Sequence, residues 1–267
     1  MTDPRTTSTT PRTPWVIGNW KQNLLRDEAS ALATRLLARV PEVRGDVRVG
    51  IAPTALCLPE VSALCAQGAI ATLAQRCGRR DAGAHTGEIG PRMLLDAGAA
   101  GALIGHSERR GDQGESSDDV AACAAAALAA GMTTVVCVGE PLSVRDAGDH
   151  ETFVISMMLE SLQEIELEQL PGSLVMAYEP VWAIGTGKTA SAAQAGEMHL
   201  ALRRALDARF GEAGRRVPLL YGGSVKPANA AGLLAPAAID GFLVGGASLD
   251  ADAFVDIVAL TAKARRT

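Results

Sequence analysis

The stretch that decides the fold is residues 176–190, which read Met-Ala-Tyr-Glu-Pro-Val-Trp-Ala-Ile-Gly-Thr-Gly-Lys-Thr-Ala. The apolar run Leu174–Tyr178 is typical of a short strand that is buried on both faces. Glu179 stands where this strand ends, and it is followed by the apolar segment Val181–Ile184 and the glycine-bounded Gly185–Gly187. A helical pattern then covers Ser191–Phe210. An acid at a strand end, followed by an apolar loop with glycine hinges, favours a catalytic base under a lid that excludes water.

A nucleotide-binding loop and a solvated surface acid are the two alternatives for this stretch. A nucleotide-binding loop of the GxxxxGK[ST] kind requires glycine where Trp182 stands, and a GxGxxG loop requires glycine where Ala190 stands, so both patterns fail. Glu179 alone is also compatible with a solvated acid at the end of a strand. The rest of the chain has to decide between a solvated acid and a catalytic one.

Composition limits the classes of function. The 267 residues are 48% hydrophobic but only 3% aromatic, so a large core has to be built from Ala, Val, Leu and Ile. The net charge of −5 argues against binding to a nucleic acid backbone. No apolar run approaches the roughly 18 residues of a membrane helix. We therefore expect neither a nucleic acid nor a membrane partner.

The N-terminal 14 residues are rich in Thr and Pro and have no apolar segment typical of a secretory signal. They are expected to form a disordered tail ahead of one domain spanning residues 15–267. Five cysteines without a CxxC pair favour buried free thiols in a reducing, cytoplasmic compartment. The four histidines show no HxxxH spacing, which argues against a zinc site.

Apolar strand patterns and helical patterns alternate along the whole chain. The expected strands are residues 15–20, 47–52, 70–75, 102–104, 134–138, 174–178, 218–221 and 241–244. Alternation at this pitch is typical of parallel strands, and eight such units in about 250 residues predict a closed α/β barrel, (β/α)8, with an outer ring of helices. A doubly wound open sheet is the alternative, but it normally has a glycine fingerprint after its first strand, and Gly18–Lys21 is not one.

Several helix boundaries are also predicted. The first helix is expected over residues 24–39, because Pro41 follows, and another over residues 150–168. Ser116 and Asp119 form a capping-box pattern before an alanine-rich helix over residues 120–130. The irregular stretch Arg76–Gly90 is long for a compact domain, and such loops are usually functional or lie at interfaces.

Four polar side chains stand at the ends of predicted strands. Asn19 and Lys21 follow the first strand, His106 follows the fourth and Glu179 follows the sixth. In a closed barrel these strand ends meet at one mouth, where active sites of this architecture lie. Each residue alone is compatible with a purely structural role, but their joint occurrence favours chemistry.

Glycines end the last two strands, in Gly222-Gly223-Ser224 and in Gly245-Gly246-Ala247-Ser248. Glycine lets the backbone approach a ligand closely, and amides at a helix start point at an anion. Loops after strands seven and eight are the usual phosphate seat of such a barrel. Gly185 in the lid offers one further amide. The ligand is therefore expected to be a small phosphorylated metabolite.

The chain closely resembles the triosephosphate isomerase family from residue 15 to about residue 262. The segments that carry the resemblance are residues 19–21, 105–110, 177–190, 221–225 and 240–249. It implies a TIM barrel and a glycolytic isomerase that interconverts dihydroxyacetone phosphate and glyceraldehyde 3-phosphate through an enediolate. It implies no metal and no organic cofactor.

The resemblance also implies residue roles. In the family, the residue matching Glu179 is the base that moves a proton between adjacent carbons of the substrate. The residue matching His106 is neutral and polarises the carbonyl group. The residue matching Lys21 supplies positive charge, and the residue matching Asn19 orients the substrate. Phosphate contacts fall on Gly185, Ser224, Gly245 and Gly246. Supporting positions near the site are Ser107, Glu108, Ile184 and Leu243, the last two as apolar cover over the base.

The long loop over residues 76–90 matches a loop by which family members interdigitate, with Thr86 reaching into the neighbouring subunit, so a homodimer is implied. Three features depart from the family: Gln22 stands where Met is common, Arg76 where Asn is usual, and residues 111–114 lack an aromatic. These departures bear on the dimer and on the approach to the site.

Three rival functions remain at this point. They are an isomerase of a four-carbon ketose phosphate using the same residues, a non-catalytic binding scaffold, and a lysine Schiff-base aldolase. The position of Lys21 beside Asn19 after the first strand makes the aldolase the poorest fit.

Overall fold

The computed structural model describes residues 12–166, 173–184, 189–236 and 238–265. Most of the predicted tail and the hinge residues 185–187 therefore lie outside the described residues, as does the end of the helix expected over residues 150–168. None of the described helices is long and apolar enough to cross a membrane.

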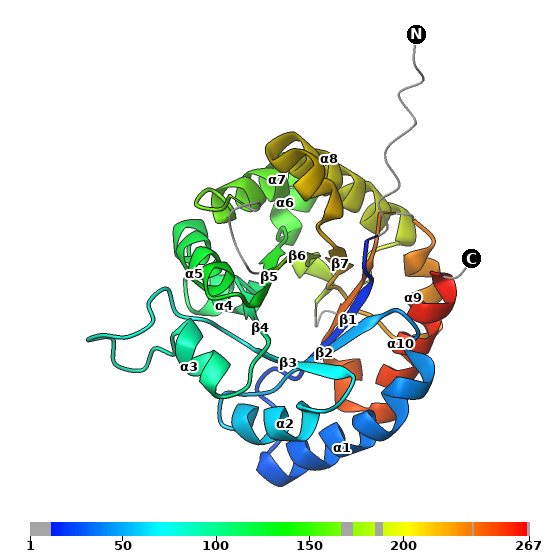
Figure 1. Cartoon of the computed structure of the whole chain (residues 1–267). Helices are drawn as coiled ribbons and strands as arrows, with labels where there is room; N and C mark the ends of the chain where they lie inside the picture. Colours follow the sequence, from blue (N-terminus) through cyan, green and yellow to red (C-terminus); the bar gives the residue numbers. More distant parts are fainter. Residues whose placement is uncertain (1–11, 167–172, 185–188, 237, 266–267) are drawn as a thin grey trace.

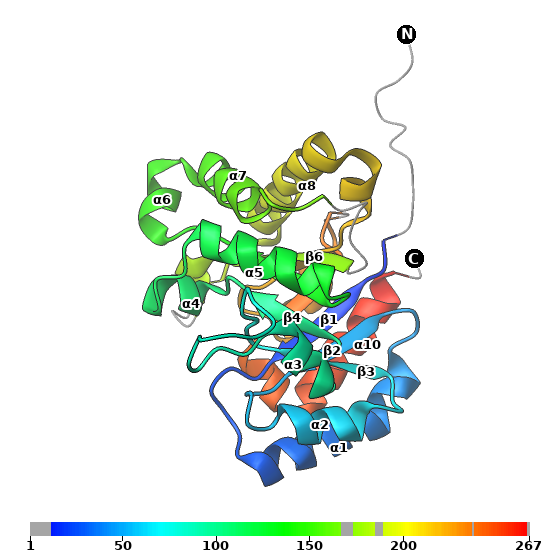
Figure 2. The same ribbon diagram turned by 60° about the vertical axis from the view of Figure 1, so that its left-hand side comes forward.

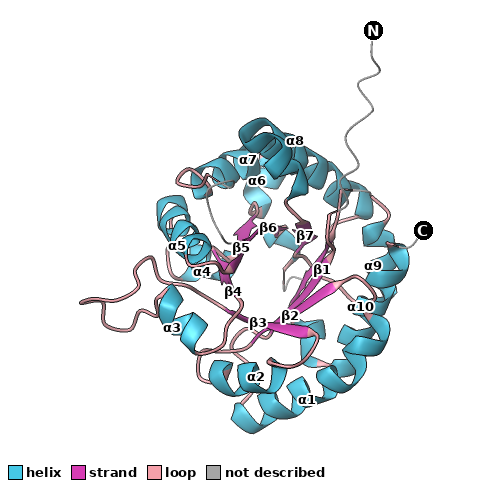
Figure 3. Cartoon of the chain, viewed as in Figure 1, coloured by secondary structure: helices cyan, strands magenta, loops and turns pink. Residues whose placement is uncertain are grey.

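Eight parallel strands close into a barrel in sequence order, and helices surround it (Figures 1 and 3). The strands are β1 (Trp15–Asn19), β2 (Arg48–Ala52), β3 (Ile70–Ala74), β4 (Gly101–Ile104), β5 (Thr133–Val138), β6 (Ser173–Tyr178), β7 (Leu219–Tyr221) and β8 (Gly241–Val244). Pairing of β1 with both β2 and β8 closes the ring. The barrel predicted from the sequence is confirmed, and the open sheet is excluded.

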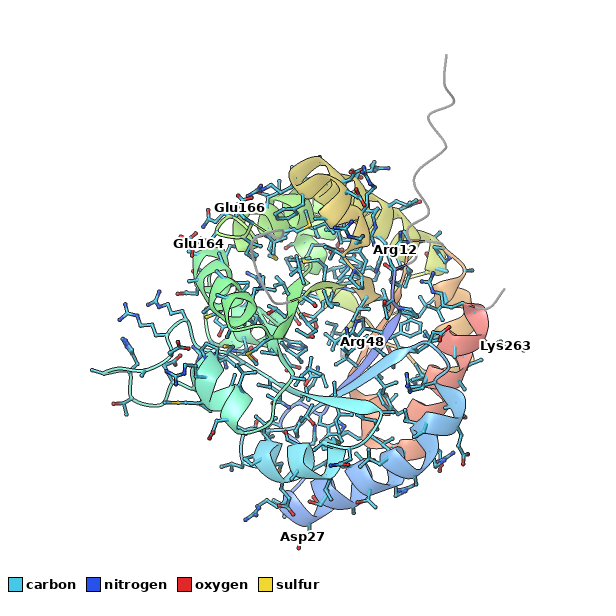
Figure 4. All side chains as sticks on the ribbon, in the orientation of Figure 1. Arg12, Asp27, Arg48, Glu164, Glu166 and Lys263 are labelled. Atoms are coloured by element: carbon cyan, nitrogen blue, oxygen red, sulfur yellow. The ribbon has the colours of Figure 1, made fainter. Side chains whose placement is uncertain are left out.

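The helices form the outer layer, and the first and last of them lie side by side (Figure 2). They are α1 (Arg26–Val43), α2 (Leu58–Cys65), α3 (Pro91–Asp96), α4 (Ser107–Asp112), α5 (Ser117–Ala129), α6 (Leu142–Ala147), α7 (His150–Ser161), α8 (Ala192–Arg216), α9 (Pro227–Leu234) and α10 (Ala251–Ala264), with short 3-10 turns over Val181–Ala183 and Gly246–Leu249. Charged side chains such as Asp27, Glu164 and Lys263 lie exposed on the outer rim (Figure 4).

Two layers of apolar side chains fix the barrel. Alternate residues of each strand point to opposite faces, so Ile17, Val135 and Val175 belong to the cluster inside the barrel. Their neighbours Val16 and Val136 belong to the larger cluster between strands and helices. Small and branched residues make up most of both layers, and the few aromatic side chains add to them, with Trp15 in the inner cluster and Trp20, Tyr178, Tyr221, Phe242 and Phe254 in the outer one. All five cysteines are buried free thiols, as predicted.

Some predicted boundaries are wrong. The first helix does not end before Pro41 but continues to Val43, because Val40 is fully buried and packing holds the last turn although the proline lacks a donor. The short helices α4 and α6 were not predicted. Helix α8 continues beyond Phe210 only across Gly211, whose φ of 56° and ψ of −132° make a kink. The capping box of Ser116 and Asp119 is confirmed.

Buried His199 in α8 makes the fold sensitive to acid. Its Nδ1 donates to the Ala195 carbonyl oxygen at 2.7 Å, and its ring lies edge-on to Tyr178 with centroids 5.7 Å apart. Burial lowers the pKa of His199 from 6.5 to about 4. The unfolded chain therefore binds a proton that the folded chain refuses between these two values, so stability falls as the pH falls.

We expect the free energy of unfolding to drop by about 3 kcal/mol between pH 6.5 and pH 4 on account of His199. Urea unfolding across this range measures the drop. A His199→Gln variant, which cannot take up the proton, should lose less stability over the same range. An equal slope in the wild type and the variant would contradict the assignment.

Candidate active site

The C-terminal ends of the strands open onto one cavity of about 850 Å³. Apart from Thr86, all the described residues that the sequence predicts for the site line this cavity. They are Asn19, Lys21, His106, Ser107, Glu108, Glu179, Ile184, Ser224, Leu243, Gly245 and Gly246. Thr86 is exposed on the β3–α3 connection, and Gly185 lies outside the described residues. Residues that are spread over most of the sequence thus share one mouth, because each follows the end of a parallel strand.

Glu179 is held between two donors at the bottom of this cavity. Its Oε1 lies 2.9 Å from His106 Nε2, and its Oε2 accepts the backbone N–H of Ser107 at 2.8 Å. The side chain is only 2% exposed. Burial by itself raises the pKa of Glu179, but the attraction of His106, its hydrogen bond and the Ser107 N–H prevail and hold the pKa below its ordinary value. The carboxylate is therefore ionised, as a base must be.

Close backbone packing fixes the position of Glu179. A Cβ on Gly139, after β5, would lie 1.7 Å from the Glu179 carbonyl oxygen. A Cβ on Gly222, after β7, would lie 2.9 Å from Glu179 Cγ. Glycine on the two flanking strands thus lets the neighbouring backbones close around the acid.

The imidazole of His106 is oriented by the start of α4. The backbone N–H of Glu108 donates to its Nδ1 at 3.3 Å, which leaves Nε2 to carry the proton that points to Glu179. Burial lowers the pKa of His106, and the Glu179 carboxylate outweighs it, so the net direction is upward. Burial and the nearby Lys21 ammonium favour the neutral ring, whereas the Glu179 and Glu108 carboxylates oppose them.

Lys21 occupies a strained turn after β1. Its φ is +50°, which costs a non-glycine residue about 1–3 kcal/mol. The turn is held by the Lys21 N–H, which donates to Asn19 Oδ1 at 3.0 Å, and by Gln75 Nε2, which donates to the Lys21 carbonyl oxygen at 2.8 Å. Lys21 Nζ lies 2.6 Å from Glu108 Oε1, so the ammonium is positioned beside His106.

Gln75 was given no role from the sequence, where a glutamine after a strand has no distinguishing signal. Its amide group donates to the carbonyl oxygens of both Lys21 and Ala52, at 2.8 and 2.9 Å. It therefore ties the ends of β1, β2 and β3 together under the strained lysine turn.

Replacing Gln75 with methionine is expected to lower kcat/KM about tenfold, because two carbonyl oxygens lose a donor that is worth about 1 kcal/mol or more. Steady-state kinetics measure the effect. Gln22→Met makes the same change in the residue after Lys21, where the side chain is exposed, and should stay within about twofold of wild type. Equal effects of the two variants would contradict a specific role for Gln75.

Glu140, after β5, is a second residue that sequence reasoning missed, since a Gly-Glu pair at a strand end also suits an exposed turn. It is fully buried, and its Oε1 accepts from Tyr178 OH at 3.0 Å and from Trp182 Nε1 at 2.8 Å. Arg145 lies 3.4 Å from the same oxygen. Glu140 thereby anchors the segment that follows Glu179, directly before the residues outside the described part.

The opposite wall of the cavity carries few polar side chains. Ser224 follows β7, and Gly245 and Gly246 follow β8, where a Cβ on Gly246 would meet nothing within 4 Å. A Cβ on Gly245 would lie 3.4 Å from Lys21 Cε. The backbone on this wall is therefore open to a ligand and close to the lysine, which suits a phosphate group. No cluster of metal-ligating side chains occurs among the described residues.

Comparison with known proteins identifies this arrangement. Residues 14–261 match the family model described as triosephosphate isomerase. Triosephosphate isomerase of Caulobacter vibrioides is 48% identical over 94% of this chain and 97% of its own length. That of Pelodictyon phaeoclathratiforme is 46% identical over 91% and 96%. A crystal structure of triosephosphate isomerase from Bartonella henselae superposes with a TM-score of 0.83 at 34% identity, covering 93% of this chain and 98% of that one.

Proposed function

Since the chain belongs to the triosephosphate isomerase family, we propose that it interconverts dihydroxyacetone phosphate and D-glyceraldehyde 3-phosphate with Glu179, His106 and Lys21 as its reacting groups. The chain is an intramolecular aldose–ketose isomerase of glycolysis and gluconeogenesis. The observation that carries the residue assignment is the contact of a buried, ionised carboxylate with an Nε2–H imidazole at 2.9 Å, in a cavity that Lys21 also lines.

The chemistry requires a base and a donor on the same substrate. Glu179 removes a proton from the carbon next to the carbonyl group and returns it to the neighbouring carbon, while the substrate's hydroxyl proton passes to the former carbonyl oxygen beside His106 Nε2. His106 Nε2–H donates to the oxygen on which negative charge develops, and the Lys21 ammonium stabilises that charge. General-base action contributes about 10²–10⁴-fold, and one oxyanion donor is worth roughly 3–4 kcal/mol. Neither contribution dominates, so both sides of the site are needed.

The contact between His106 and Glu179 is broken when substrate binds. In the free enzyme, His106 Nε2–H donates its hydrogen bond to Glu179. In the complex, the same N–H donates to the substrate oxygen instead. Substrate binding thus frees the carboxylate and retains the donor, and burial of both side chains keeps their interactions strong. Asn19, whose Oδ1 accepts from the Lys21 N–H, orients the substrate together with the lysine.

The phosphate group is assigned to Ser224, Gly245 and Gly246, with Gly185 as a further contact. Support comes from the open backbone of this wall and its closeness to Lys21. Ile184 and Leu243 supply apolar surface beside the base. Ser107 and Glu108 support the site through the contacts of their backbone N–H groups and of the Glu108 carboxylate.

A coupled assay on the purified protein tests the function. Dihydroxyacetone phosphate and glyceraldehyde 3-phosphate should both be turned over, with kcat/KM well above that for a four-carbon ketose phosphate. Absence of triose phosphate turnover at any protein concentration would overturn the proposal. Trapping with borohydride should leave the protein unmodified, since no Schiff base forms on Lys21.

A homodimer is supported by the β3–α3 connection, residues 75–90, which projects from the barrel and carries the exposed Thr86 (Figure 1). Met93, in the helix that directly follows this connection, is 51% exposed. A cavity of about 400 Å³ beside the active site is lined by Lys21, Gln75, Glu108 and neighbouring residues. We propose that the β3–α3 connection of a second copy of the chain fills this cavity, which would bring its Thr86 close to Gln75 and Glu108, the residues that hold Lys21.

Sedimentation velocity measures the oligomeric state, and a monomer at all concentrations would contradict the dimer. The five buried free thiols support a cytoplasmic location.

A further inference from the structure

Arg76 stands at the foot of the projecting loop and connects three parts of the chain. Its Nε lies 3.2 Å from Glu115 Oε1, and its NH1 forms an ion pair with Glu88. Glu88 belongs to the returning limb of the loop, whereas Glu115 precedes α5 on the barrel. The same Glu115 oxygen accepts from Arg109 Nε at 2.5 Å. Two guanidinium groups and two carboxylates thus form one compact network.

This network is at the base of the loop and not at its tip. The backbone N–H of Gly78 donates to the Ile89 carbonyl oxygen at 2.8 Å and forms a second link between the two limbs. Among the hydrogen bonds of the described residues, the tip, residues 80–87, bonds within itself, through His85 to Gly83 and to Arg80. It also bonds to the returning limb, where the backbone N–H of Glu88 donates to the His85 carbonyl oxygen at 3.0 Å. The limbs are therefore fixed to each other and to the barrel, while the tip is free to meet another surface.

The Glu115 half of the network is shielded more than an ordinary surface ion pair. Glu115 is 13% exposed and Arg76 32% exposed at the side chain, whereas Glu88 is 44% exposed. Partial burial reduces screening by salt, and a planar guanidinium donates charge-assisted bonds to two carboxylates at once, whereas an amide side chain carries no charge.

We propose that Arg76 is a positioning residue that holds the loop in its docking conformation before a second copy binds. Ordering a loop during association costs affinity, and a loop that is already ordered avoids that cost. The proposal rests on the homodimer proposed above. It assigns the anchor to the ion pairs with Glu88 and Glu115, and the docking contact itself to the tip around Thr86.

The anchor is also connected to the catalytic lysine. Arg76 directly follows Gln75, which donates to the Lys21 carbonyl oxygen. On the other side, Arg109 directly follows Glu108, which contacts Lys21 Nζ at 2.6 Å. A loop that is loosened by loss of Arg76 should therefore lower activity through loss of the dimer, and activity should return when the dimer is restored.

The test compares Arg76→Gln with wild type and with Arg79→Gln. Arg79 lies on the same limb and pairs with Asp119 at 3.8 Å, without reaching the returning limb. Sedimentation equilibrium gives the dimer Kd, and specific activity is measured over a range of protein concentrations. Loss of two partly exposed ion pairs predicts a Kd raised about tenfold by Arg76→Gln. Arg79→Gln should change the Kd by about twofold at most.

Three further outcomes belong to the proposal. At protein concentrations far above the new Kd, Arg76→Gln should recover wild-type kcat/KM. Arg76→Lys, which keeps the charge but not the fork, should fall between wild type and Arg76→Gln. Glu88→Gln should raise the dimer Kd less when it is added to the Arg76→Gln variant than when it is added to the wild type.

An unchanged dimer Kd in Arg76→Gln overturns the proposal, and so does an equal effect of Arg79→Gln. A loss of activity that high protein concentration does not recover overturns it as well, since that would indicate damage to the barrel. If the wild type is itself monomeric, the homodimer fails and the anchor fails with it. A wild-type dimer that is insensitive to Arg76 leaves the homodimer standing and removes only the anchor.

Discussion

Glu179→Gln is expected to lower kcat by about 10²–10⁴-fold with little change in KM, because the amide cannot accept a proton from carbon. The substitution keeps the size of the side chain, and the amide oxygen can still accept the Ser107 N–H. The fold should therefore survive. Steady-state kinetics measure kcat, and NMR of substrate in deuterated water reports exchange at the carbon next to the carbonyl group.

The matched control is Glu108→Gln, the same change in a second carboxylate of the cavity. Glu108 holds Lys21 but has no contact with His106 Nε2 or the Ser107 N–H, so a smaller loss is expected. If Glu179→Gln retains more than a tenth of wild-type kcat, or if the two variants lose equally, Glu179 is not the base.

His106→Ala is expected to lower kcat/KM by about 10²–10³-fold, the loss that follows removal of one oxyanion donor. A second effect is expected on Glu179. Its pKa is held down by the imidazole against the opposing effect of burial, so the pKa should rise when the imidazole is removed. A carboxylate must be ionised to act as a base. When the pH is lowered, the variant should therefore lose its residual activity at a higher pH than the wild type does.

His106→Gln separates the two effects, because the glutamine amide still donates a hydrogen bond in the cavity but cannot take up a proton as the imidazole does. It should lose less activity than His106→Ala. The pH dependence of kcat/KM across the acid range measures the shift. A loss of less than tenfold in His106→Ala, with folding confirmed by circular dichroism, would contradict the assignment of His106 as the donor.

Local sequence patterns predict some helix boundaries of this chain correctly and others not. The capping box at Ser116 was predictable because it joins residues three positions apart. The end of α1 was not, because burial of Val40 outweighs the local signal of Pro41. The short helix α4 was also missed, although it carries the backbone N–H groups that orient His106 and Glu179. Six residues are too few to show a helical period.

The sequence by itself determined the alternation of strands and helices, and therefore the barrel and the polar residues at its mouth. These features depend on near neighbours and on the rule that parallel strands end on one side. Only the tertiary structure decided which polar groups pair. Ser107 and Glu179 are 72 positions apart, and Lys21 and Glu108 are 87 apart, yet each pair is in hydrogen-bond contact. Such pairings follow from ring closure and side-chain packing, which no local pattern encodes. The same holds for Gln75, Arg76 and Glu140, whose roles depend on partners that only the closed barrel brings within reach.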